Sequence, residues 1–320
     1  MILVTGGAGF IGSNLVNFLT ENQKKEIVSV DLNNKKNDHY FKSKKIIKIR
    51  PANLNDFLKK NKKKIELVIH LGAITSTLEK NIKLIIENNI ELSIFLWNWC
   101  AKNKKRFIYA SSAATYGDGS NKFDDDDSEE YLSELFPLNL YGWSKHIFDK
   151  FVQEKRRSGF FPVQCVGLKF FNVYGPNEFH KEDMRSVILK IYQTVSMNLD
   201  VKLFKSHNCN FKDGEQLRDF IYVKDVIKIV KWFIDNKKMN GLFNVGTGKP
   251  RSFNDIAKAV FKHSNSEKKI KYINTPIEIR RQYQYLTSAN TKKLRSLGYK
   301  ENFMTLEEGI EDYIRNYLKK

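Results

Sequence analysis

Short runs of apolar residues alternate along the chain with longer segments in which apolar residues recur every three or four positions. The apolar runs predict parallel strands covered on both faces, because strands buried in this way are hydrophobic almost throughout. The clearest runs cover residues 1–5, 26–31, 67–71, 106–110 and 163–170. The segment 10–22 between the first two runs predicts an amphipathic helix. This alternation predicts an α/β fold with a Rossmann-type, doubly wound parallel sheet.

The pattern changes in the second half of the chain, where polar stretches separate the elements. The predicted helices and strands there cover residues 186–197, 220–223, 225–236, 242–245 and 306–317. We expect residues 1–170 to form the Rossmann domain and residues 219–248 to return to it. We expect residues 171–218 and 249–320 to form a smaller, discontinuous C-terminal lobe that binds the substrate.

The composition narrows the class of protein. With 320 residues, 41% of them hydrophobic, the chain can build a sizeable core. It contains no apolar stretch near the roughly 18–20 residues of a membrane span, so we expect no membrane partner. Cys100, Cys165 and Cys209 are widely spaced, which fits neither a disulfide framework nor a metal site, and we expect no metal. Free thiols and the absence of a leader-like N-terminal segment predict a cytoplasmic protein.

The formal net charge is +19. Such an excess can indicate nucleic-acid binding, a polyanionic small substrate, or the composition of a lysine-rich proteome. The lysines are scattered, and none forms the block of five or six like charges that marks a basic arm. We therefore expect solvated surface lysines and no nucleic-acid partner. Four consecutive aspartates at 124–127 predict an exposed acidic loop.

A glycine-rich loop follows the first strand. Gly6 would permit a tight turn, Gly9 the close approach of a pyrophosphate, and Gly12 the close packing of helix on strand. The helix begins at Phe10 and Ile11, and its free N–H groups would face the phosphates. The loop therefore predicts a dinucleotide site and makes the larger lobe an NAD(P)-binding domain.

The second strand ends at Asp31, followed by Leu32. A carboxylate there would accept hydrogen bonds from the adenosine ribose and repel a 2′-phosphate, which favours NAD. Lys35 and Lys36 follow closely and could neutralise the same phosphate. These residues leave the choice between NAD and NADP open.

Small residues also follow the third clear strand. The segment Leu71-Gly72-Ala73 would let the backbone pass close to a cofactor. On the next helix, Asn88 or Asn89 is either a cofactor contact or a solvated polar position.

Tyr141 and Lys145 lie four residues apart, on one face of a predicted helix. A phenol with a pKa of roughly 10 is a weak base at neutral pH, but a nearby ammonium favours the phenolate. Lys145 can also hydrogen-bond a nicotinamide ribose. Ser112, just after the strand at 106–110, can hold the substrate oxygen that Tyr141 deprotonates. Without the other motifs, Tyr141 and Lys145 would be interpreted as a pair of exposed side chains with no catalytic role.

The order of glycine loop, strand-end serine and Tyr-x-x-x-Lys resembles the extended short-chain dehydrogenase/reductase superfamily, whose members mostly act on nucleotide-linked sugars. Dehydratases of that superfamily place an Asp-Glu pair after the serine, and related decarboxylases place a Glu there. This chain has Ala113-Ala114 after Ser112. The resemblance therefore implies epimerisation or simple redox chemistry, because the acid/base groups for elimination and decarboxylation are missing.

A longer segment narrows the resemblance. Residues 169–181, KFFNVYGPNEFHK, are similar to the NVYGPxxxHK segment of ADP-L-glycero-D-manno-heptose 6-epimerases. The opening MILVTGGAGFIGSN, the segments ASSAATYG, YGWSK and FNVGTG, and Arg281 to Gln284 extend the likeness over almost the whole chain. In that family the Tyr of YxxxK and the Lys of the HK pair are the acid/base groups, which here are Tyr141 and Lys181.

The resemblance implies NADP as the cofactor and a role for each matching residue. The catalytic residues implied are Tyr141, Lys181, Ser112 and Lys145. The cofactor contacts implied are Gly6, Gly9, Phe10, Ile11, Gly12, Asp31, Leu32, Leu71, Gly72, Ala73, Asn88, Lys145, Val173 and Lys181. The substrate contacts implied are Ser112, Asn172, Asp183, Lys190, Phe204, Arg218 and Tyr283. From the residues alone, Lys181 can also be a solvated loop lysine, and Arg218 and Tyr283 structural residues between the lobes.

The reaction implied is epimerisation at C6 of an ADP-linked heptose by transient oxidation, which supplies a precursor of the lipopolysaccharide core. The resemblance also implies a homo-oligomer. The family has Gly-Ser where this chain has Glu182-Asp183, a His where it has Lys190, and a shorter stretch before Arg218. Because these positions contact the substrate, another nucleotide-sugar epimerase, such as a UDP-hexose 4-epimerase, is an alternative. A non-enzymatic NAD(P)-sensing or RNA-binding protein is the alternative from a different class.

Overall fold

The computed structural model describes residues 1–33, 35–280 and 283–319. Among these residues, seven strands form one parallel sheet in the order β11-β6-β5-β4-β1-β2-β3. The strands are β1 (Ile2–Thr5), β2 (Ile27–Val30), β3 (Ile47–Ile49), β4 (Leu67–His70), β5 (Arg106–Ser112), β6 (Gln164–Phe170) and β11 (Gly241–Val245). This order is that of a doubly wound Rossmann sheet, so the predicted fold class is confirmed.

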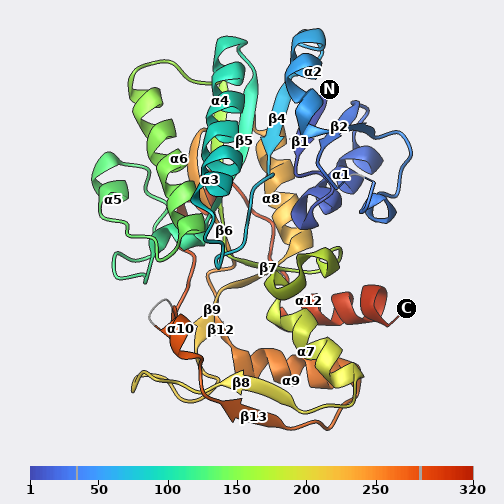
Figure 1. Ribbon diagram of the computed structural model, residues 1–320, viewed down its shortest axis with the longest axis vertical. Helices are drawn as coiled ribbons and strands as arrows, with labels where there is room; N and C mark the ends of the chain where they lie inside the picture. The colour runs from blue at the N-terminus through green and yellow to red at the C-terminus, as the bar shows by residue number, and fades with distance from the viewer. Residues whose placement is uncertain (34, 281–282, 320) are drawn as a thin grey trace.

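Helices cover both faces of this sheet (Figure 1). One face packs against α1 (Phe10–Asn22) and α8 (Val223–Asp235). The other face packs against α2 (Leu54–Lys60), α4 (Leu92–Lys102) and α6 (Leu140–Arg157). Ile2 and Val4 of β1 join the first core, whereas Leu3 joins the second. The continuous hydrophobic pattern of the strands follows, because successive side chains enter opposite cores.

The remaining helices near the sheet are short. They are α3 (Ile82–Ile85), which runs through a π-helical segment (Ile86–Glu91) into α4, α5 (Glu129–Ser133) and α11 (Lys292–Ser296). A 3-10 turn (Ala113–Tyr116) follows β5.

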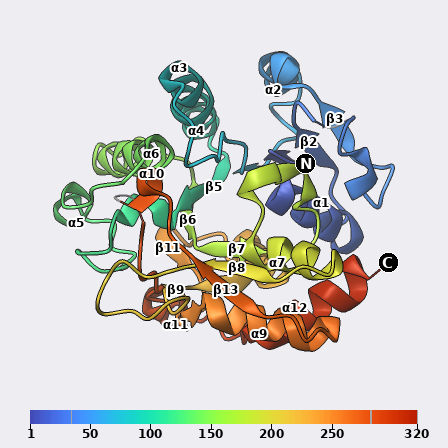
Figure 2. The ribbon, with the colours of Figure 1, turned by 60° about the horizontal axis from the view of Figure 1, so that its bottom comes forward.

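A smaller lobe lies below the larger one in Figure 1 and comes forward in Figure 2. It contains α7 (Val187–Ser196), α9 (Phe253–Ser264), α10 (Ile277–Arg280), α12 (Leu306–Tyr313) and the parallel pair β8 (Val201–Phe204) and β13 (Ile270–Ile273). Helix α9 packs against both α7 and α12 around a core of its own. Short strand pairs join the lobes: β7 (Asn172–Tyr174) with β10 (Phe220–Tyr222), and β9 (Leu217–Arg218) with β12 (Arg251–Ser252).

Within residues 219–248, α8 and β11 belong to the larger lobe, whereas β10 pairs with β7. The last helix was predicted to continue to residue 317. The α-helical part, α12, ends at Tyr313, and a π-helical segment (Ile314–Leu318) continues the helix directly, so the helical region agrees with the prediction. Of the sequence motif Arg281 to Gln284, the first two residues lie outside the described residues.

The acidic run differs from its prediction as an exposed loop. Asp125 is buried, and its carboxylate accepts the Asn244 backbone N–H at 2.9 Å. Asp127 is partly buried and forms ion pairs with Arg156 at 2.8 Å and with Lys293 at 3.4 Å. The prediction was wrong because groups remote in sequence compensate the negative charges of Asp125 and Asp127. These groups are the Asn244 N–H of β11 and the cations of Arg156 and Lys293.

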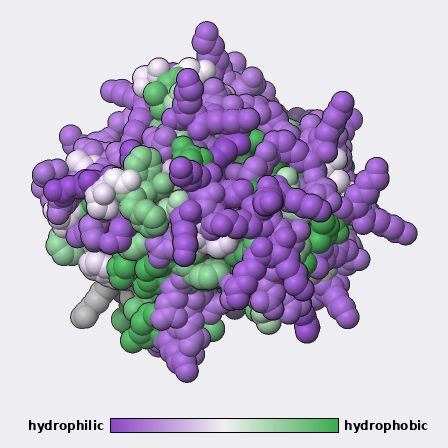
Figure 3. All heavy atoms as spheres, turned by 90° about the horizontal axis from the view of Figure 1, so that it is seen from above, coloured by the Kyte–Doolittle hydropathy of each residue, from purple (hydrophilic) through white to green (hydrophobic). Residues whose placement is uncertain are grey.

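The surface of the larger lobe is mostly hydrophilic, with small apolar patches between projecting polar side chains (Figure 3). In the part of the chain that the structure describes, no helix is both long and apolar enough to cross a membrane. The same residues contain no group of three His, Cys, Asp or Glu side chains that could hold a metal ion.

Candidate active site

The glycine loop connects β1 to α1 in close contact with the strand beside it. Gly6 has φ of +67°, and a Cβ atom there would lie 2.7 Å from the Gly72 Cα. A Cβ atom on Gly12 would lie 1.9 Å from the Gly6 carbonyl oxygen. No described side chain caps α1. The loop therefore has the geometry that a dinucleotide pyrophosphate requires, with the positive end of α1 facing it.

The end of β2 lies against the same loop. The Asp31 carboxylate accepts hydrogen bonds from the Ala8 N–H at 3.1 Å and from the Asn33 N–H at 2.8 Å. Leu32 is exposed next to it. This arrangement suits a contact between Asp31 and an adenosine ribose bound at the glycine loop.

On the other side of β1, Leu71 and Ala73 are half-buried beside Gly72. Asn88 is half-buried, and its amide donates to the Leu84 carbonyl at 2.9 Å. Its neighbour Asn89 is fully buried and holds the Ile74 backbone N–H at 2.8 Å. Asn89 is thus the structural residue of the two, and Asn88 stays the predicted cofactor contact.

Tyr141 and Lys145 lie on the first turns of α6, which begins because the Asn139 side chain accepts the Gly142 N–H at 2.8 Å. Burial raises the pKa of Tyr141, and a hydrogen bond with Ser112 at the end of β5 lowers it. Lys145 is 3% exposed, and burial lowers its pKa to about 8. The structure thus brings together the three residues that the sequence predicted to act together.

Behind this cluster lies a buried ion pair that sequence reasoning missed. The Lys169 ammonium lies 3.0 Å from the Asp149 carboxylate, and both side chains are fully buried. Asp149 also accepts the Ser111 hydroxyl at 2.7 Å, and Lys169 donates to the Thr115 hydroxyl at 2.7 Å. These bonds hold the backbone on both sides of Ser112. Two signals were available: Asp149 follows Lys145 by four residues, and Lys169 is a charge inside an apolar strand.

Lys181 reaches the glycine loop from the smaller lobe. It lies in a 3-10 segment (Phe179–Met184), and its ammonium is 5.6 Å from the centre of the Phe10 ring at the start of α1. Burial lowers its pKa, and the neighbouring Glu178 carboxylate raises it. Val173 is half-buried in β7 and packs on the cores of both lobes. Lys181 is therefore not the solvated loop lysine that the sequence alone allowed.

Three of the predicted substrate residues, Arg218, Tyr283 and Phe204, contact one another in the smaller lobe and form what we call the Arg218 group. The Arg218 guanidinium lies 5.3 Å from the centre of the Tyr283 ring, and the Tyr283 ring lies 6.2 Å from that of Phe204. Arg218 is 8% exposed, and burial lowers its pKa to about 10. Among the described residues, no carboxylate lies within ion-pairing distance of it. A buried, uncompensated cation is costly, and an anionic ligand would offset that cost.

One side chain links this group to the catalytic loop. Arg218 donates to the Gln284 carbonyl, and the Gln284 amide donates to the Gly117 carbonyl at the end of the turn that follows Ser112. Asp219, also missed from the sequence, accepts the backbone N–H groups of Thr247 and Ala289 at 2.7 and 2.9 Å. Gln284 thus holds the Arg218 group against the Ser112 loop, and Asp219 anchors the backbone at Thr247 and Ala289.

The other predicted substrate residues lie at the surface. Asn172 is exposed on β7, and Asp183 and Lys190 are exposed near the start of α7. The Lys190 ammonium donates to the Asp183 carbonyl at 2.7 Å. These two residues are therefore neighbours, and both belong to the positions at which the chain departs from the heptose epimerases.

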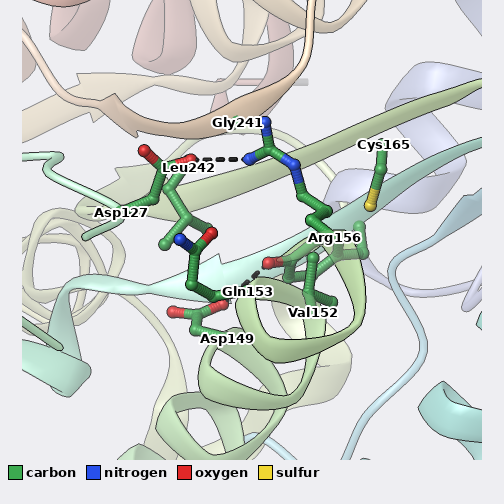
Figure 4. A pocket seen from close by; sticks show the side chains of 9 residues that line it. Asp127, Asp149, Val152, Gln153, Arg156, Cys165, Gly241 and Leu242 are labelled. Carbon is green, nitrogen blue, oxygen red and sulfur yellow. Dashed lines mark hydrogen bonds and ion pairs between the residues drawn. The ribbon is translucent and has the colours of Figure 1, made fainter. Parts of the chain in front are cut away.

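A small pocket lies elsewhere, towards the other end of α6 from Tyr141. Figure 4 shows the side chains that line it, among them Asp127, Gln153, Arg156, Cys165 and Leu242. Its walls are joined by the Asp127–Arg156 ion pair and a hydrogen bond from Tyr109 to Asp149 at 3.0 Å. The pocket is a gap between α6, β6 and β11, away from the cofactor loop.

The fold, the glycine loop and the Ser-Tyr-Lys cluster define a nicotinamide-dinucleotide enzyme of the short-chain dehydrogenase/reductase type. The chain belongs to the NAD dependent epimerase/dehydratase family, whose model matches residues 2–246.

Several proteins similar to this chain over nearly its whole length are heptose epimerases. An ADP-L-glycero-D-manno-heptose-6-epimerase of Fusobacterium nucleatum is 44% identical, with 100% of this chain and 98% of the relative covered. One of Nitratidesulfovibrio vulgaris (strain DP4) is 42% identical over 99% of this chain and 98% of the relative. The predicted resemblance to these epimerases is therefore confirmed.

Solved structures of epimerases also resemble the chain. The ADP-L-glycero-D-manno-heptose-6-epimerase of Helicobacter pylori superposes with a TM-score of 0.79 at 32% identity, covering 98% of this chain and 94% of that one. A UDP-N-acetylglucosamine 4-epimerase of Methanobrevibacter ruminantium reaches 0.84 at 24% identity, covering 99% and 98%, which shows the shared fold alone.

Proposed function

We propose that this chain inverts C6 of an ADP-linked heptose, converting ADP-D-glycero-β-D-manno-heptose into ADP-L-glycero-β-D-manno-heptose for the lipopolysaccharide core. Relatives that carry this name at 39–44% identity support it. The structural observation that carries it is the pairing of Tyr141 with Ser112 on one lobe and of Lys181 with Phe10 from the other. Inversion at one carbon suits two proton-transfer groups, because the oxygen changes position between oxidation and reduction.

The glycine loop and the start of α1 would hold the nicotinamide dinucleotide, which would supply reversible hydride transfer at C6. Ser112 holds the C6 hydroxyl and Tyr141 takes its proton. Lys145 favours the phenolate of Tyr141 by its charge. After the end of the sugar turns about the C5–C6 bond, Lys181 supplies the proton to the oxygen. Arg218 holds the ADP pyrophosphate throughout, so that the nucleotide does not reorient.

The test is incubation of the purified protein with ADP-D-glycero-β-D-manno-heptose and, separately, with UDP-glucose and UDP-N-acetylglucosamine. We expect the L-glycero product, resolved by chromatography and NMR, from the heptose substrate alone. Turnover of the UDP-hexoses without turnover of the heptose would favour the 4-epimerase alternative and reject the proposal.

As part of the same proposal, the cofactor site accepts both dinucleotides. Asp31 favours NAD, whereas the exposed Lys35 and Lys36 accommodate the 2′-phosphate of NADP. Fluorescence titrations with NADH and NADPH check this. Asp31→Asn should shift preference towards NADPH, and the double change Lys35→Ala and Lys36→Ala should weaken NADPH binding while NADH binding persists. Failure of the wild type to bind NADPH would remove NADP from the proposal.

We further propose a cytoplasmic homo-oligomer. Exposed apolar side chains on α6 and on the neighbouring α3 segment support association, among them Ile82, Ile86, Trp143 and Ile147. Light scattering coupled to size-exclusion chromatography measures the oligomeric state, and a monomer at micromolar concentration would contradict this part.

A further inference from the structure

The loop from Gly175 to Ser186, between β7 and α7, carries Lys181 in an unusual backbone conformation. Asn177 has φ of +71°, and Glu182 has φ of +49° with ψ of −118°. Side chains with a Cβ atom rarely adopt positive φ, and such residues persist where the surroundings over-determine them. We therefore expect specific contacts to constrain the backbone of this loop.

The side chain of Glu178 joins the two ends of the loop. It is 1% exposed, and its carboxylate accepts the Gly175 N–H at 3.2 Å, where the loop begins. It also accepts the Ser186 N–H at 2.5 Å and the Ser186 hydroxyl at 2.7 Å, where the loop ends and α7 starts. Charge-assisted bonds of this kind are among the strongest in proteins. Glu178 thus closes the loop from inside.

The closed loop lies on the first turns of α1. The Asn14 amide donates to the Pro176 carbonyl at 2.9 Å, and the Asn177 amide donates to the Ser13 hydroxyl at 3.1 Å. Lys181 projects from the same loop to the Phe10 ring. The helix that receives the dinucleotide therefore also receives the loop that carries the second proton-transfer group.

The charged groups around Lys181 come from several elements. Glu178 lies on the same loop as Lys181, and burial first, then the charge of Lys181, lower the pKa of the adjacent His180. Asp31 and Lys36, from the segment after β2, act on His180 rather than on Lys181. On α12, burial and the Glu178 carboxylate both raise the pKa of Tyr313. Glu178 is the carboxylate that acts directly on Lys181.

We propose that Glu178 is a positioning residue: its buried carboxylate closes the loop 175–186 and holds the Lys181 ammonium beside the start of the cofactor helix. The inference rests on the proposed function of Lys181. It adds that the geometry and the charge of Lys181 depend on a side chain that does not touch the substrate.

The test compares the wild type with Glu178→Gln, which keeps the shape but removes the charge. The first readout is acetylation of Lys181 by acetic anhydride as a function of pH, quantified by peptide mass spectrometry, with the exposed Lys258 as internal reference. Because the Glu178 carboxylate favours the charged ammonium, its removal should lower the midpoint for Lys181 by about one pH unit. An unchanged midpoint in a folded variant would overturn the proposal.

The second readout is the epimerase rate per folded molecule. We expect Glu178→Gln to lower kcat by roughly 10- to 100-fold while the Kd for NADH stays within about twofold. A purely structural role would lower the melting temperature and leave kcat and the Lys181 midpoint unchanged, and that outcome rejects the proposal. If the heptose is not turned over at all, the proposed function fails, whereas the acetylation profile still tests Glu178.

A second variant covers the case in which Glu178→Gln does not fold. Ser186→Ala removes a donor to Glu178 but keeps the carboxylate, so kcat should fall by about threefold to tenfold with an unchanged Lys181 midpoint. Ser186 also caps α7, because its hydroxyl accepts the Leu189 N–H. The matched control is therefore Ser252→Ala, which removes the equivalent cap of α9 in the same lobe. An equal loss of kcat in both cap variants would contradict a specific role for the loop.

Discussion

At the scale of single residues, burial changes the chemistry of the site before any ligand is present. Lys145 keeps its proton at neutral pH, because its pKa falls only to about 8. Burial first, and then the positive charge of Lys145, lower the pKa of His70 to about 3, so its imidazole is neutral. Its ring hydrogen-bonds Thr5 at 2.6 Å, directly before the glycine loop. The cluster thus presents a buried cation beside a tyrosine, next to the predicted cofactor site.

The role of Tyr141 is tested by Tyr141→Phe, which removes the phenol and keeps the ring. We expect kcat to fall by about 10²-fold or more, since a proton-transfer group is lost. NADH binding and the melting temperature should change little. A non-enzymatic cofactor-sensing protein would retain its function in this variant, and an unaffected epimerase rate would exclude Tyr141 from the mechanism.

The hydrogen bond from Ser112 predicts a pH effect. This bond lowers the pKa of Tyr141, so Ser112→Ala should raise that pKa. Because the phenolate is the active form, the acid limb of the pH profile of kcat should move to higher pH, by roughly half to one unit. The exposed Ser133→Ala serves as control. A shift towards lower pH would contradict the assigned direction.

At the scale of secondary-structure elements, buried charges join strands and helices that the hydrophobic pattern brings together. The pair of Asp149 on α6 and Lys169 on β6 also reaches Ser111 on β5 through Asp149. The buried Glu178 carboxylate in the loop 175–186 joins β7 to α7 in a similar way. In both cases a buried charged group sets the relative position of two elements, whereas the stability of their packing comes mostly from apolar burial.

Breaking the buried pair should cost much more than breaking an exposed one. Lys169→Met leaves the Asp149 carboxylate buried without its cation, and we expect a loss of about 3–5 kcal/mol in the free energy of unfolding. The matched control is Lys224→Met, which breaks the more exposed pair with Asp312 and should cost less than about 1 kcal/mol. Urea denaturation measures both. Equal losses would contradict the prediction.

The backbone at Glu182 predicts a stabilising substitution. Its φ of +49° and ψ of −118° suit glycine, which has no Cβ atom to clash in this conformation. Glu182→Gly should therefore raise the free energy of unfolding by about 1 kcal/mol by relieving strain, with activity retained. Asn265→Gly, at a left-handed cap that asparagine tolerates, should change stability less. Thermal unfolding decides, and a lower melting temperature for Glu182→Gly would count against strain at this position.

At the scale of the whole molecule, the candidate site exists because two lobes meet. The larger lobe contributes the glycine loop and the Ser-Tyr-Lys cluster, and the smaller lobe contributes Lys181 and the Arg218 group. Two contacts hold the lobes together: the hydrogen bond from Gln284 to Gly117, and the packing of the loop 175–186 on α1. The excess of positive charge takes little part in this, because most lysines lie at a hydrophilic surface such as that in Figure 3.

Arg218 provides the test at this scale. Arg218→Met should raise the KM for the ADP-sugar by roughly 10- to 100-fold, because charge-assisted bonds to the pyrophosphate are lost, with unchanged NADH binding. The control is Arg251→Met on the paired strand, whose guanidinium already binds Asp255 and Glu307. Steady-state kinetics distinguishes them, and a similar KM for both variants would remove Arg218 from the substrate site.

The sheet, the helices on its two faces, the glycine loop and the spacing of Tyr141 and Lys145 could all be predicted from the amino-acid sequence. These features are local, since hydrophobic periodicity and a four-residue helical spacing depend on neighbours along the chain. The family could be identified for the same reason, because the motifs shared with the heptose epimerases are short contiguous segments of sequence.

Three features became visible only in the folded chain: the contact of Lys181 with Phe10, the contact of Arg218 with the Tyr283 ring, and the burial of Asp125. The partners in these contacts lie far apart in the chain. Whether a lysine is solvated or a carboxylate is compensated depends on which distant groups packing brings within a few ångströms, and no local pattern records that.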